Sequence, residues 1–419
     1  MFEHVETVIV GGGQAGLAVS YYLSQQGRAH TILEQASQPA NAWRNHRWDS
    51  FTLVTPNWMT RMPGAEYEGD DPDGFMPRDQ VVAYLEEYIE RFRLPVQYGV
   101  RVRSVEPNGA GYLVHTGGAT VKAANVVMAT GLFQQPKIPP ISAHLPVEIR
   151  QLHSSEYRNP AALPAGAVLV VGSAQSGAQI TEELYQSGRQ VYLSVGGSGR
   201  GPRRYRGKDI TWWLDKTAFN EVTVDKLPSP KAKFAASIQA SGKDGGHTIN
   251  LHQFARDGVV LLGRVQAAQG SKITLAPNLK ENLAKADEFE ADLLRKIDAY
   301  IERSGLDVPR ETLLELRDGY DAEVITELDL QSAGITSVIW ATGYKFDFGL
   351  VRLPVIDGDG YPIQERGITD HPGLYFVGLP WLHTGKSGIL LGIGDDAAHV
   401  ARHIDARTTP IARRIQQTA

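Results

Sequence analysis

The sequence predicts an α/β fold made of two nested Rossmann-like dinucleotide-binding domains. A short apolar run, a glycine-rich turn and a helix-period stretch follow one another twice, with the turns at Gly11–Gly16 and Gly172–Gly177. After each unit a later apolar run ends in Ala-Thr-Gly, at 129–131 and at 341–343. Because strand, glycine turn and helix in this order form a dinucleotide-binding unit, two copies predict two such domains in one chain.

Length and composition limit the possible functions. The 419 residues leave room for two or three domains. The formal net charge of −5 gives no basic field that would gather nucleic acid or an anionic membrane, and no secretory signal or long apolar segment is evident. There is no cysteine, so thiol nucleophiles, disulfides and cysteine-ligated metal centres are excluded, and redox chemistry needs a bound cofactor. We expect a cytoplasmic protein without a metal site; the oligomeric state stays open, with a homodimer as one alternative.

The first unit is expected to bind a dinucleotide at its glycine turn. One glycine permits the tight bend, the second lets a pyrophosphate approach the backbone, and the third lets the helix pack on the strand. The start of the helix then offers free amides to the phosphates. A strand over 31–33 ends on a glutamate, which is placed where a carboxylate can accept both ribose hydroxyls. The residues expected to hold this dinucleotide are Gly11, Gly13, Gln14, Ala15, Gly16 and Glu34.

The second unit has Ala174 in place of the middle glycine, and its second strand, expected over 190–195, ends without a carboxylate. A basic cluster follows, at Arg200, Arg203, Arg204, Arg206 and Lys208. A missing acid beside guanidinium groups suits a ribose 2′-phosphate, so NADPH is expected rather than NADH. A plain packing turn and a solvated basic loop remain alternatives. The expected cofactor contacts are Gly172, Ser173, Gln175, Ser176, Gly177, Arg203, Arg204 and Lys208.

The remaining elements indicate how the domains are divided. The pattern predicts short strands with a glycine hairpin within 112–126, helices over 178–186 and 287–302, a strand over 374–378 and a helix from Asp395. The last strand and helix would return the chain to the first domain, and the positive end of that helix would stabilise a reduced cofactor. The predicted division is 1–133 and 334–419 for the first domain, with 134–333 as the inserted second domain.

These features, in this order, resemble the flavin-containing monooxygenases, in which an FAD domain and an NADPH domain are nested in a single chain. The resemblance covers nearly the whole chain and includes the stretch 48–57, which in the family passes over the flavin ring. It implies an FAD domain with an inserted NADPH domain. Segments 71–75 and 202–209 are similar to a bacterial subgroup of uncertain substrate. The further cofactor contacts that the resemblance implies are Trp43, Arg44, Thr130, Gly131, Thr342, Gly343 and, at the last helix, Asp395.

The family's fingerprint, F-x-G-x-x-x-H-x-x-x-(Y/F), falls on residues 147–157. His153 and Tyr157 match it, whereas Val147 and Ile149 stand where the phenylalanine and the glycine belong. A tyrosine rather than a tryptophan at the last position favours oxidation of a nitrogen or sulfur atom over oxygen insertion beside a ketone. The resemblance implies catalytic roles for Asn57, His153 and Tyr157. By residue type alone, a turn asparagine and a histidine bonded to backbone remain alternatives for the first two.

The expected reaction uses both cofactors, a small-molecule substrate and molecular oxygen. NADPH would reduce the flavin, oxygen would form a flavin C4a-hydroperoxide, and an amine or sulfide would take the distal oxygen. Two alternatives stay open: an NADPH oxidase or dehydrogenase on the same fold, and a non-catalytic flavin-binding partner. No motif stands out between Lys208 and Gly334, so the residues that select the substrate are not identified.

Overall fold

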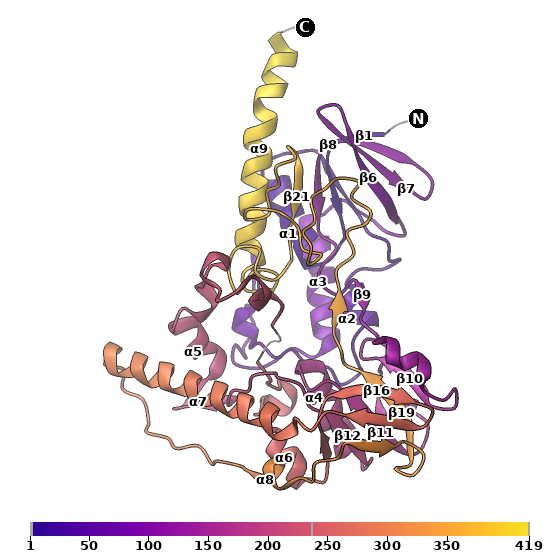
Figure 1. Cartoon of the computed structure of the whole chain (residues 1–419). Helices are drawn as coiled ribbons and strands as arrows, with labels where there is room; N and C mark the ends of the chain where they lie inside the picture. The colour runs from indigo at the N-terminus through magenta and orange to yellow at the C-terminus, as the bar shows by residue number, and fades with distance from the viewer. Residues whose placement is uncertain (1–2, 236–237, 418–419) are drawn as a thin grey trace.

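The computed structural model describes residues 3–235 and 238–417, and it confirms the predicted α/β architecture. Two sheets with parallel cores lie in different parts of the molecule, and the long helix α9 (Ile393–Gln417) packs on α1 (Gln14–Gln25) beside the first sheet (Figure 1). One hydrophobic cluster includes Ile9 of the first sheet, Val170 of the second and Tyr157 of the segment between them. The apolar core therefore continues from one sheet to the other.

The first sheet has seven strands and carries the N-terminal glycine turn. β1 lies at its centre, with β2 and then β5 on one side and β8 on the other, all parallel. Two strands pair with the other edge of β8. Its first residues pair antiparallel with β7, and its last residues pair parallel with β21. The strands are β1 (Glu3–Val10), β2 (His30–Leu33), β5 (Val96–Gln97), β6 (Val102–Asn108), β7 (Gly111–Thr116), β8 (Thr120–Met128) and β21 (Leu374–Phe376). The strand predicted at 374–378 thus forms in this sheet.

The second sheet has five parallel strands in the order β10-β19-β11-β12-β15. They are β10 (Arg150–His153), β11 (Ala167–Val171), β12 (Val191–Ser194), β15 (Val260–Leu262) and β19 (Ile335–Trp340). Because β19 pairs with β10 and β11, residues 335–340 belong to the second sheet. The predicted end of the second domain at 333/334 therefore falls before a strand of the second sheet. An apolar run in the sequence identifies a strand but not the strand with which it pairs. We propose a limit near β20 (Tyr344–Lys345).

The two connections between the sheets lie side by side. β9 (Gln135–Pro136), on the outward connection, pairs antiparallel with β20 on the return. The amide of Lys137 donates to the carbonyl of Gly343 at 2.9 Å, and the hydroxyl of Thr342 donates to the carbonyl of Lys137. The second Ala-Thr-Gly segment is therefore held by the connection that leaves the first.

The helices that follow the glycine turns end at glycines. α1 and α4 (Gln175–Gln186) stop just before Gly27 and Gly188, whose φ angles of +66° and +85° suit the end of a helix. α4 begins before the predicted Ala178 because the glycine turn itself supplies its first turn, and α9 begins at Ile393. The first domain also contains α2 (Asn41–Asn45), α3 (Arg78–Phe92) and the hairpin β3 (Arg61–Met62) and β4 (Ala65–Glu66).

The segment without motifs forms most of the insertion between β12 and β19. Its elements are β13 (Arg204–Tyr205), β14 (Lys208–Asp209), α5 (Ile210–Lys216), α6 (Leu251–Arg256), β16 (Val265–Gln269), β17 (Lys272–Leu275), α7 (Leu279–Ser304), α8 (Asp318–Asp321) and β18 (Glu327–Asp329). α7 includes the predicted helix over 287–302 and is longer at both ends; in Figure 1 it lies near α5, α6 and α8. A search of the described helices finds none with the length and apolar character that a membrane span requires.

Candidate cofactor and active site

The two glycine turns have the same backbone geometry. The first glycine of each turn has a left-handed φ, +110° at Gly11 and +105° at Gly172. A Cβ on Gly11 would lie 2.4 Å from the carbonyl oxygen of Ala129, and a Cβ on Gly172 would lie 2.5 Å from that of Ala341. Each Ala-Thr-Gly segment therefore runs directly beside a turn, where only glycine fits.

The other turn glycines differ in their surroundings. A Cβ on Gly16 would lie 2.0 Å from the carbonyl oxygen of Gly11, and one on Gly177 would lie 1.8 Å from that of Gly172, so both helices pack tightly on their turns. At Gly13, by contrast, no described atom lies within 4 Å of a Cβ position. The first turn thus leaves open space at the N-terminus of α1, which fits a pyrophosphate on the free amides of that helix.

Glu34 ends β2 and closes the first turn. Its two carboxylate oxygens accept hydrogen bonds from the amides of Gly12, at 2.7 Å, and Ala36, at 2.8 Å. Each oxygen keeps room for a further donor, so the carboxylate can also receive ribose hydroxyls. In the second unit the hydroxyl of Ser173 accepts from the amide of Gly196 at 2.9 Å instead. The residues of this chain therefore fit FAD at the first turn and leave the ribose of the second dinucleotide without an acid.

Arg264, between β15 and β16, lies beside the glycine loop that follows β12, and the sequence analysis did not identify it. Its Nη2 is 3.6 Å from where a Cβ of Gly197 would stand, and its side chain is exposed. It lies just beyond the carboxyl end of a parallel strand, where ligands of doubly wound sheets bind, and that position was the available signal. Arg264 is therefore placed to meet a 2′-phosphate.

Replacing Arg264 with alanine is expected to raise the KM for NADPH by about tenfold, because a charge-assisted hydrogen bond to the 2′-phosphate is lost. The KM for NADH should hardly change, since NADH lacks that phosphate. Steady-state rates of flavin-dependent NADPH and NADH oxidation measure both values. Arg204→Ala is the matched control, because the Arg204 guanidinium is exposed and donates to the carbonyl of Gly245 at 3.3 Å. A selective loss in the control alone would restore the assignment made from the basic cluster.

Most of that basic cluster is engaged within the protein. Arg203 is 2% exposed, and its Nε and Nη2 donate to the two carboxylate oxygens of Asp209. Its Nη1 donates to the carbonyl of Val54 at 2.7 Å, and its guanidinium lies 4.6 Å from the ring centre of Phe75. These contacts hold the segment that the resemblance places over the flavin. These contacts therefore favour a structural role for Arg203, in which it fixes that segment, over the predicted contact with a cofactor phosphate.

The other predicted basic residues are also placed by the insertion. Arg206 forms an ion pair with Asp298 at 2.8 Å. Lys208 is exposed, and its ammonium lies 5.5 Å from the ring centre of Trp212. For Arg204 and Lys208 the cofactor role remains a prediction.

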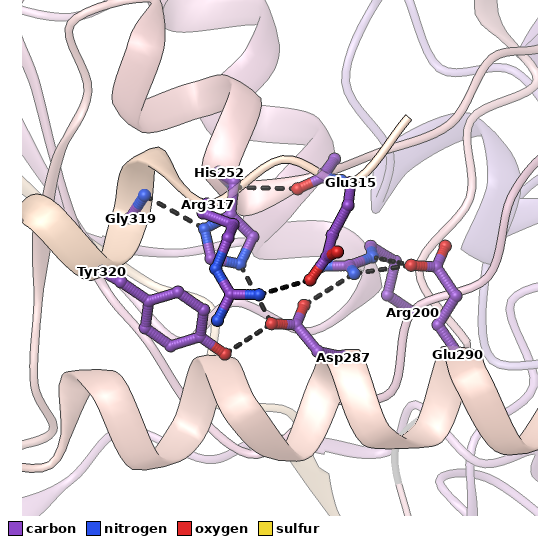
Figure 2. Close-up of polar contacts among 9 residues, drawn as sticks. Arg200, His252, Asp287, Glu290, Glu315, Arg317, Gly319 and Tyr320 are labelled. Carbon is purple, nitrogen blue, oxygen red and sulfur yellow. Dashed lines mark hydrogen bonds and ion pairs between the residues drawn. The ribbon is translucent and has the colours of Figure 1, made fainter. Parts of the chain in front are cut away.

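A buried polar network fixes the loop that follows β12 (Figure 2). Arg200 is 4% exposed and donates to Asp287 at 2.6 Å and to Glu290, both on α7. Asp287 also accepts from the hydroxyl of Tyr320 and lies 3.3 Å from Nε2 of His252. The amide of Gly319 donates to His252 Nδ1 at 3.0 Å, so Nε2 carries the proton that faces Asp287. The network ties α6, α7 and α8 to the glycine loop at the second ribose position.

This network should make stability depend on pH at the acid end. Hydrogen bonds from His252 and Tyr320, together with the charge of Arg200, lower the pKa of Asp287 from 3.8 to about 2 against the opposing effect of burial. A folded-state pKa below the unfolded value stabilises the fold fully above pH 3.8, and the contribution is lost as the pH falls towards 2. Asp287→Asn is expected to lower the free energy of unfolding at pH 7 by about 1 to 2 kcal/mol, after discounting for the exposed part of the side chain.

Thermal unfolding of wild type and Asp287→Asn between pH 7 and pH 2.5 measures this effect. The difference in Tm should shrink steadily below about pH 4. Asp292→Asn is the control on the same helix, because Asp292 pairs only with Lys296 and Arg295 at the surface, and its Tm should match wild type. A difference between wild type and Asp287→Asn that does not change with pH would contradict the assignment.

His153 is fully buried at the end of β10 and has a partner on each ring nitrogen. Nε2 donates to the carbonyl of Gly343 at 3.0 Å, and Nδ1 accepts from the amide of Ser155 at 3.2 Å. Burial is the main cause that lowers its pKa, so the ring is neutral at pH 7. Its ring also meets that of Tyr344 edge to face, with centres 4.8 Å apart. The geometry therefore favours a role in positioning the second Ala-Thr-Gly segment.

Tyr157 supports a carboxylate that contacts the first domain. It is fully buried, and its hydroxyl donates to Glu183 of α4 at 2.7 Å. The other oxygen of Glu183 accepts from the hydroxyl of Ser50 at 2.6 Å. Burial and this carboxylate raise the pKa of Tyr157, so it stays protonated. Val147, at the first fingerprint position, is 95% exposed and contributes nothing to this contact.

Asn57 lies in a short helical turn (Asn57–Met59) and is 5% exposed. Its Nδ2 donates to the carbonyl of Asp71 at 2.8 Å, whereas Oδ1 is buried and has no partner among the described residues. The hydroxyl of Thr60, three residues later, is also buried and has no partner among the described residues. Buried polar atoms are nearly always paired, so these two atoms mark a place where a ligand can complete the hydrogen bonds.

The remaining predicted contacts lie around the two turns. Gln14, at the start of α1, donates to the carbonyl of Gly388 at 2.8 Å, and Ala15 packs where a Cβ on Gly378 would stand. The side chain of Gln175 exchanges hydrogen bonds with the backbone of Ala240, next to Ser176 at the start of α4. Trp43 and Arg44 lie on α2, where Arg44 pairs with Glu86 at 2.5 Å.

Two of these contacts are also held within the protein. Thr130, beside Gly131, accepts from Gln134 at 2.9 Å. Asp395 forms an ion pair with Lys386 at 3.0 Å in the first turn of α9. Their cofactor roles, like those of the residues around the two turns, remain predictions.

Two matching glycine turns, each beside an Ala-Thr-Gly segment and each at the start of a helix, define a flavoprotein of the two-dinucleotide class, and comparisons with known proteins agree. Residues 8–256 match the family described as pyridine nucleotide-disulphide oxidoreductase. An uncharacterized CzcO-like oxidoreductase of Geobacillus kaustophilus is 33% identical over 96% of this chain and 98% of its own length. A probable indole-3-pyruvate monooxygenase of Arabidopsis thaliana is 27% identical over 98% of this chain and 89% of its own. The solved flavin-containing monooxygenase from Stenotrophomonas maltophilia matches with a TM-score of 0.68 and 20% identity over 97% of this chain and all of that one.

The chain therefore belongs to the pyridine nucleotide-disulphide oxidoreductase family, and the predicted resemblance to the flavin-containing monooxygenases is confirmed. It is an oxidoreductase whose fold is that of the flavin-containing monooxygenases. The disulphide branch of the family does not apply, because the chain has no cysteine to carry electrons beyond the flavin.

Proposed function

We propose that the protein adds one oxygen atom from O2 to a nitrogen or sulfur atom of a small molecule. The reaction consumes substrate, O2, NADPH and a proton, and yields oxygenated substrate, NADP⁺ and water. The observation that carries the proposal is the pair of dinucleotide turns in a chain without cysteine. Electrons that reach the flavin have no thiol to go to, so oxygen is the natural acceptor. The oxygenases among the similar proteins support the same reaction type.

When bound, the cofactors would supply hydride transfer to the flavin and oxygen activation as a flavin C4a-hydroperoxide. The chain would bind and orient them. Gly13 and Glu34 would hold the pyrophosphate and ribose of FAD, while the turn at Gly172 and the side chain of Arg264 would hold NADPH. The hydrogen-bonded chain of Ser50, Glu183 and Tyr157 would keep the two domains in register, so that hydride donor and acceptor meet.

Asn57 is the residue that we propose completes the oxygenation site. Its buried Oδ1 lacks a protein partner, and the amide group keeps one hydrogen beyond that used on Asp71. It can therefore both accept from and donate to a ligand. His153 and Tyr157 are proposed as positioning residues, because their polar atoms are already satisfied by the protein.

An NADPH oxidase is the second candidate, and the exposure of Val147 favours it. A fingerprint position that faces solvent cannot help to exclude water from the site. Anaerobic reduction with NADPH followed by rapid mixing with oxygen separates the candidates. A long-lived absorbance intermediate with little hydrogen peroxide is expected. Immediate return of oxidised flavin with one peroxide per NADPH would identify an oxidase, and no reduction by NADPH would identify a non-catalytic flavoprotein.

A further inference from the structure

Arg47 is a buried cation for which the described residues supply no anion. It follows α2, is 9% exposed, and its Nη1 donates to the carbonyl of His46 at 2.8 Å. Three rings surround the guanidinium carbon, with centres 5.2 Å away at Trp43, 5.5 Å at Phe51 and 4.5 Å at Phe133. Within the side chains that the structure describes, no carboxylate forms an ion pair with it. Burial lowers its pKa, which shows how little in the protein compensates the charge.

The other arginines whose side chains are buried in the described part of the chain have carboxylate partners. Arg200, at 4% exposure, has two carboxylates, and Arg203, at 2%, has Asp209 on two of its nitrogens. Burying a guanidinium without a partner is strongly unfavourable, and a contact with an aromatic face returns less than an ion pair does. The rings around Arg47 therefore compensate only part of that cost. A bound anion would supply the remainder.

A second guanidinium lies beside Arg47. Arg158 donates to the carbonyls of Arg47, at 3.3 Å, and Ser155, at 3.0 Å, and the carboxylate of Asp49 interacts with its charge without forming an ion pair among the described residues. Burial and the charges of Arg47 and Arg158 together lower the pKa of His46. Arg44, one turn before Arg47, is neutralised by Glu86. Arg47 is therefore the guanidinium of this region that has no carboxylate partner among the described residues.

Arg47 lies where the chain passes between the domains. Phe133 follows the first Ala-Thr-Gly segment and Tyr344 follows the second, and their ring centres are 4.9 Å apart. Tyr344 lies close enough to Arg47 to oppose the effect of burial on the pKa of the guanidinium. Arg47 thus lies at both interdomain connections, beside residues that closely follow the two Ala-Thr-Gly segments. A ligand that spans the two domains would meet it.

We propose that Arg47 binds an oxyanion, a carboxylate or a phosphate, of a small molecule seated between the two domains, with the rings of Trp43, Phe51 and Phe133 around it. The inference deepens the proposed function, on which it rests, because the two sources of this chemistry are an acidic substrate and the phosphates of a dinucleotide. A planar guanidinium held between rings presents a fixed fork to such a group.

The test uses Arg47→Gln, Arg47→Lys and the purified FAD-containing wild type. Arg61→Gln is the matched control, because Arg61 also lies over a ring, that of Trp58 at 5.8 Å, but is exposed. Binding to oxidised enzyme is followed by the flavin spectrum for phenylacetate, for its uncharged amide phenylacetamide, and for NADP⁺. These binding measurements need no turnover. Their outcome is therefore independent of the oxygenase test, and either test can fail while the other succeeds.

If the anion is a substrate carboxylate, wild type binds phenylacetate at least about tenfold more tightly than phenylacetamide, and Arg47→Gln removes that preference while Arg47→Lys keeps part of it. If it is a phosphate, Arg47→Gln instead weakens NADP⁺ binding or lowers the FAD content by a similar factor. The proposal is overturned if FAD content, NADP⁺ affinity and the preference for phenylacetate all stay within about twofold of wild type. Should Arg47→Gln not fold, a wild type whose Tm is raised by neither phenylacetate nor inorganic pyrophosphate overturns it equally.

Discussion

Gly13→Val is expected to give a folded protein that contains essentially no FAD. Gly13 has φ −82° and ψ −178°, an extended conformation that valine adopts readily, and no described atom lies within 4 Å of its Cβ position. The isopropyl group would instead fill the space left for the pyrophosphate, at a cost of roughly 3 kcal/mol or more in FAD binding. The visible spectrum of the purified protein measures the flavin, and circular dichroism measures the fold.

Two further variants sharpen this prediction. Gly16→Val should prevent folding, because its Cβ would lie 2.0 Å from the carbonyl oxygen of Gly11. Ala174→Val, at the matching position of the second turn, should stay yellow but lose reduction by NADPH. A fully yellow Gly13→Val protein would show that the FAD phosphates lie elsewhere.

Arg203→Ala is expected to lower the free energy of unfolding by about 3 to 5 kcal/mol, because it leaves the carboxylate of Asp209 buried and unpaired. Asp209 is 10% exposed and also caps α5 by accepting from the amide of Thr211 at 2.9 Å. The ratio of the KM values for NADPH and NADH should not change. Urea unfolding of the FAD-containing protein and steady-state kinetics measure the two quantities.

The double variant Arg203→Met with Asp209→Asn serves as the control. It removes both charges yet keeps an acceptor for the cap of α5, so most of the lost stability should return. In the double variant the contacts of residue 203 with Val54 and Phe75 should remain weaker than in wild type. The expected sign is more hydrogen peroxide released per NADPH consumed. A stable Arg203→Ala protein with a selective loss of NADPH affinity would support the phosphate role inferred from the sequence instead.

The dinucleotide turns could be predicted because their causes are local. The close packing at Gly16 and the acid that follows β2 depend on neighbours within about two dozen residues, and sequence spacing records them. The same holds for the second turn and for the helix-ending glycines. Family resemblance then assigned FAD and NADPH to the two turns.

Charge and burial, however, depend on contacts between distant segments. A run of arginines after β12 looks the same whether it faces a phosphate or pairs with α5 and α7, and only the fold brought Asp209, Asp287 and Glu290 to it. Arg264 and Arg47 belong to no sequence motif. The proposed role of Arg264 depends on its contact with a loop 67 residues away, and that of Arg47 depends on rings from separate segments of the chain.

The sequence alone determined that two dinucleotide domains are nested in this chain and that no thiol takes part, since the spacing of the glycines and the composition are read directly from it. The tertiary structure showed that β19 pairs in the second sheet, which cations already have carboxylate partners, and which groups bond to His153 and Tyr157. Strand pairing and the cost of burying charge are properties of the assembled fold, which is why spacing along the chain could not reveal them.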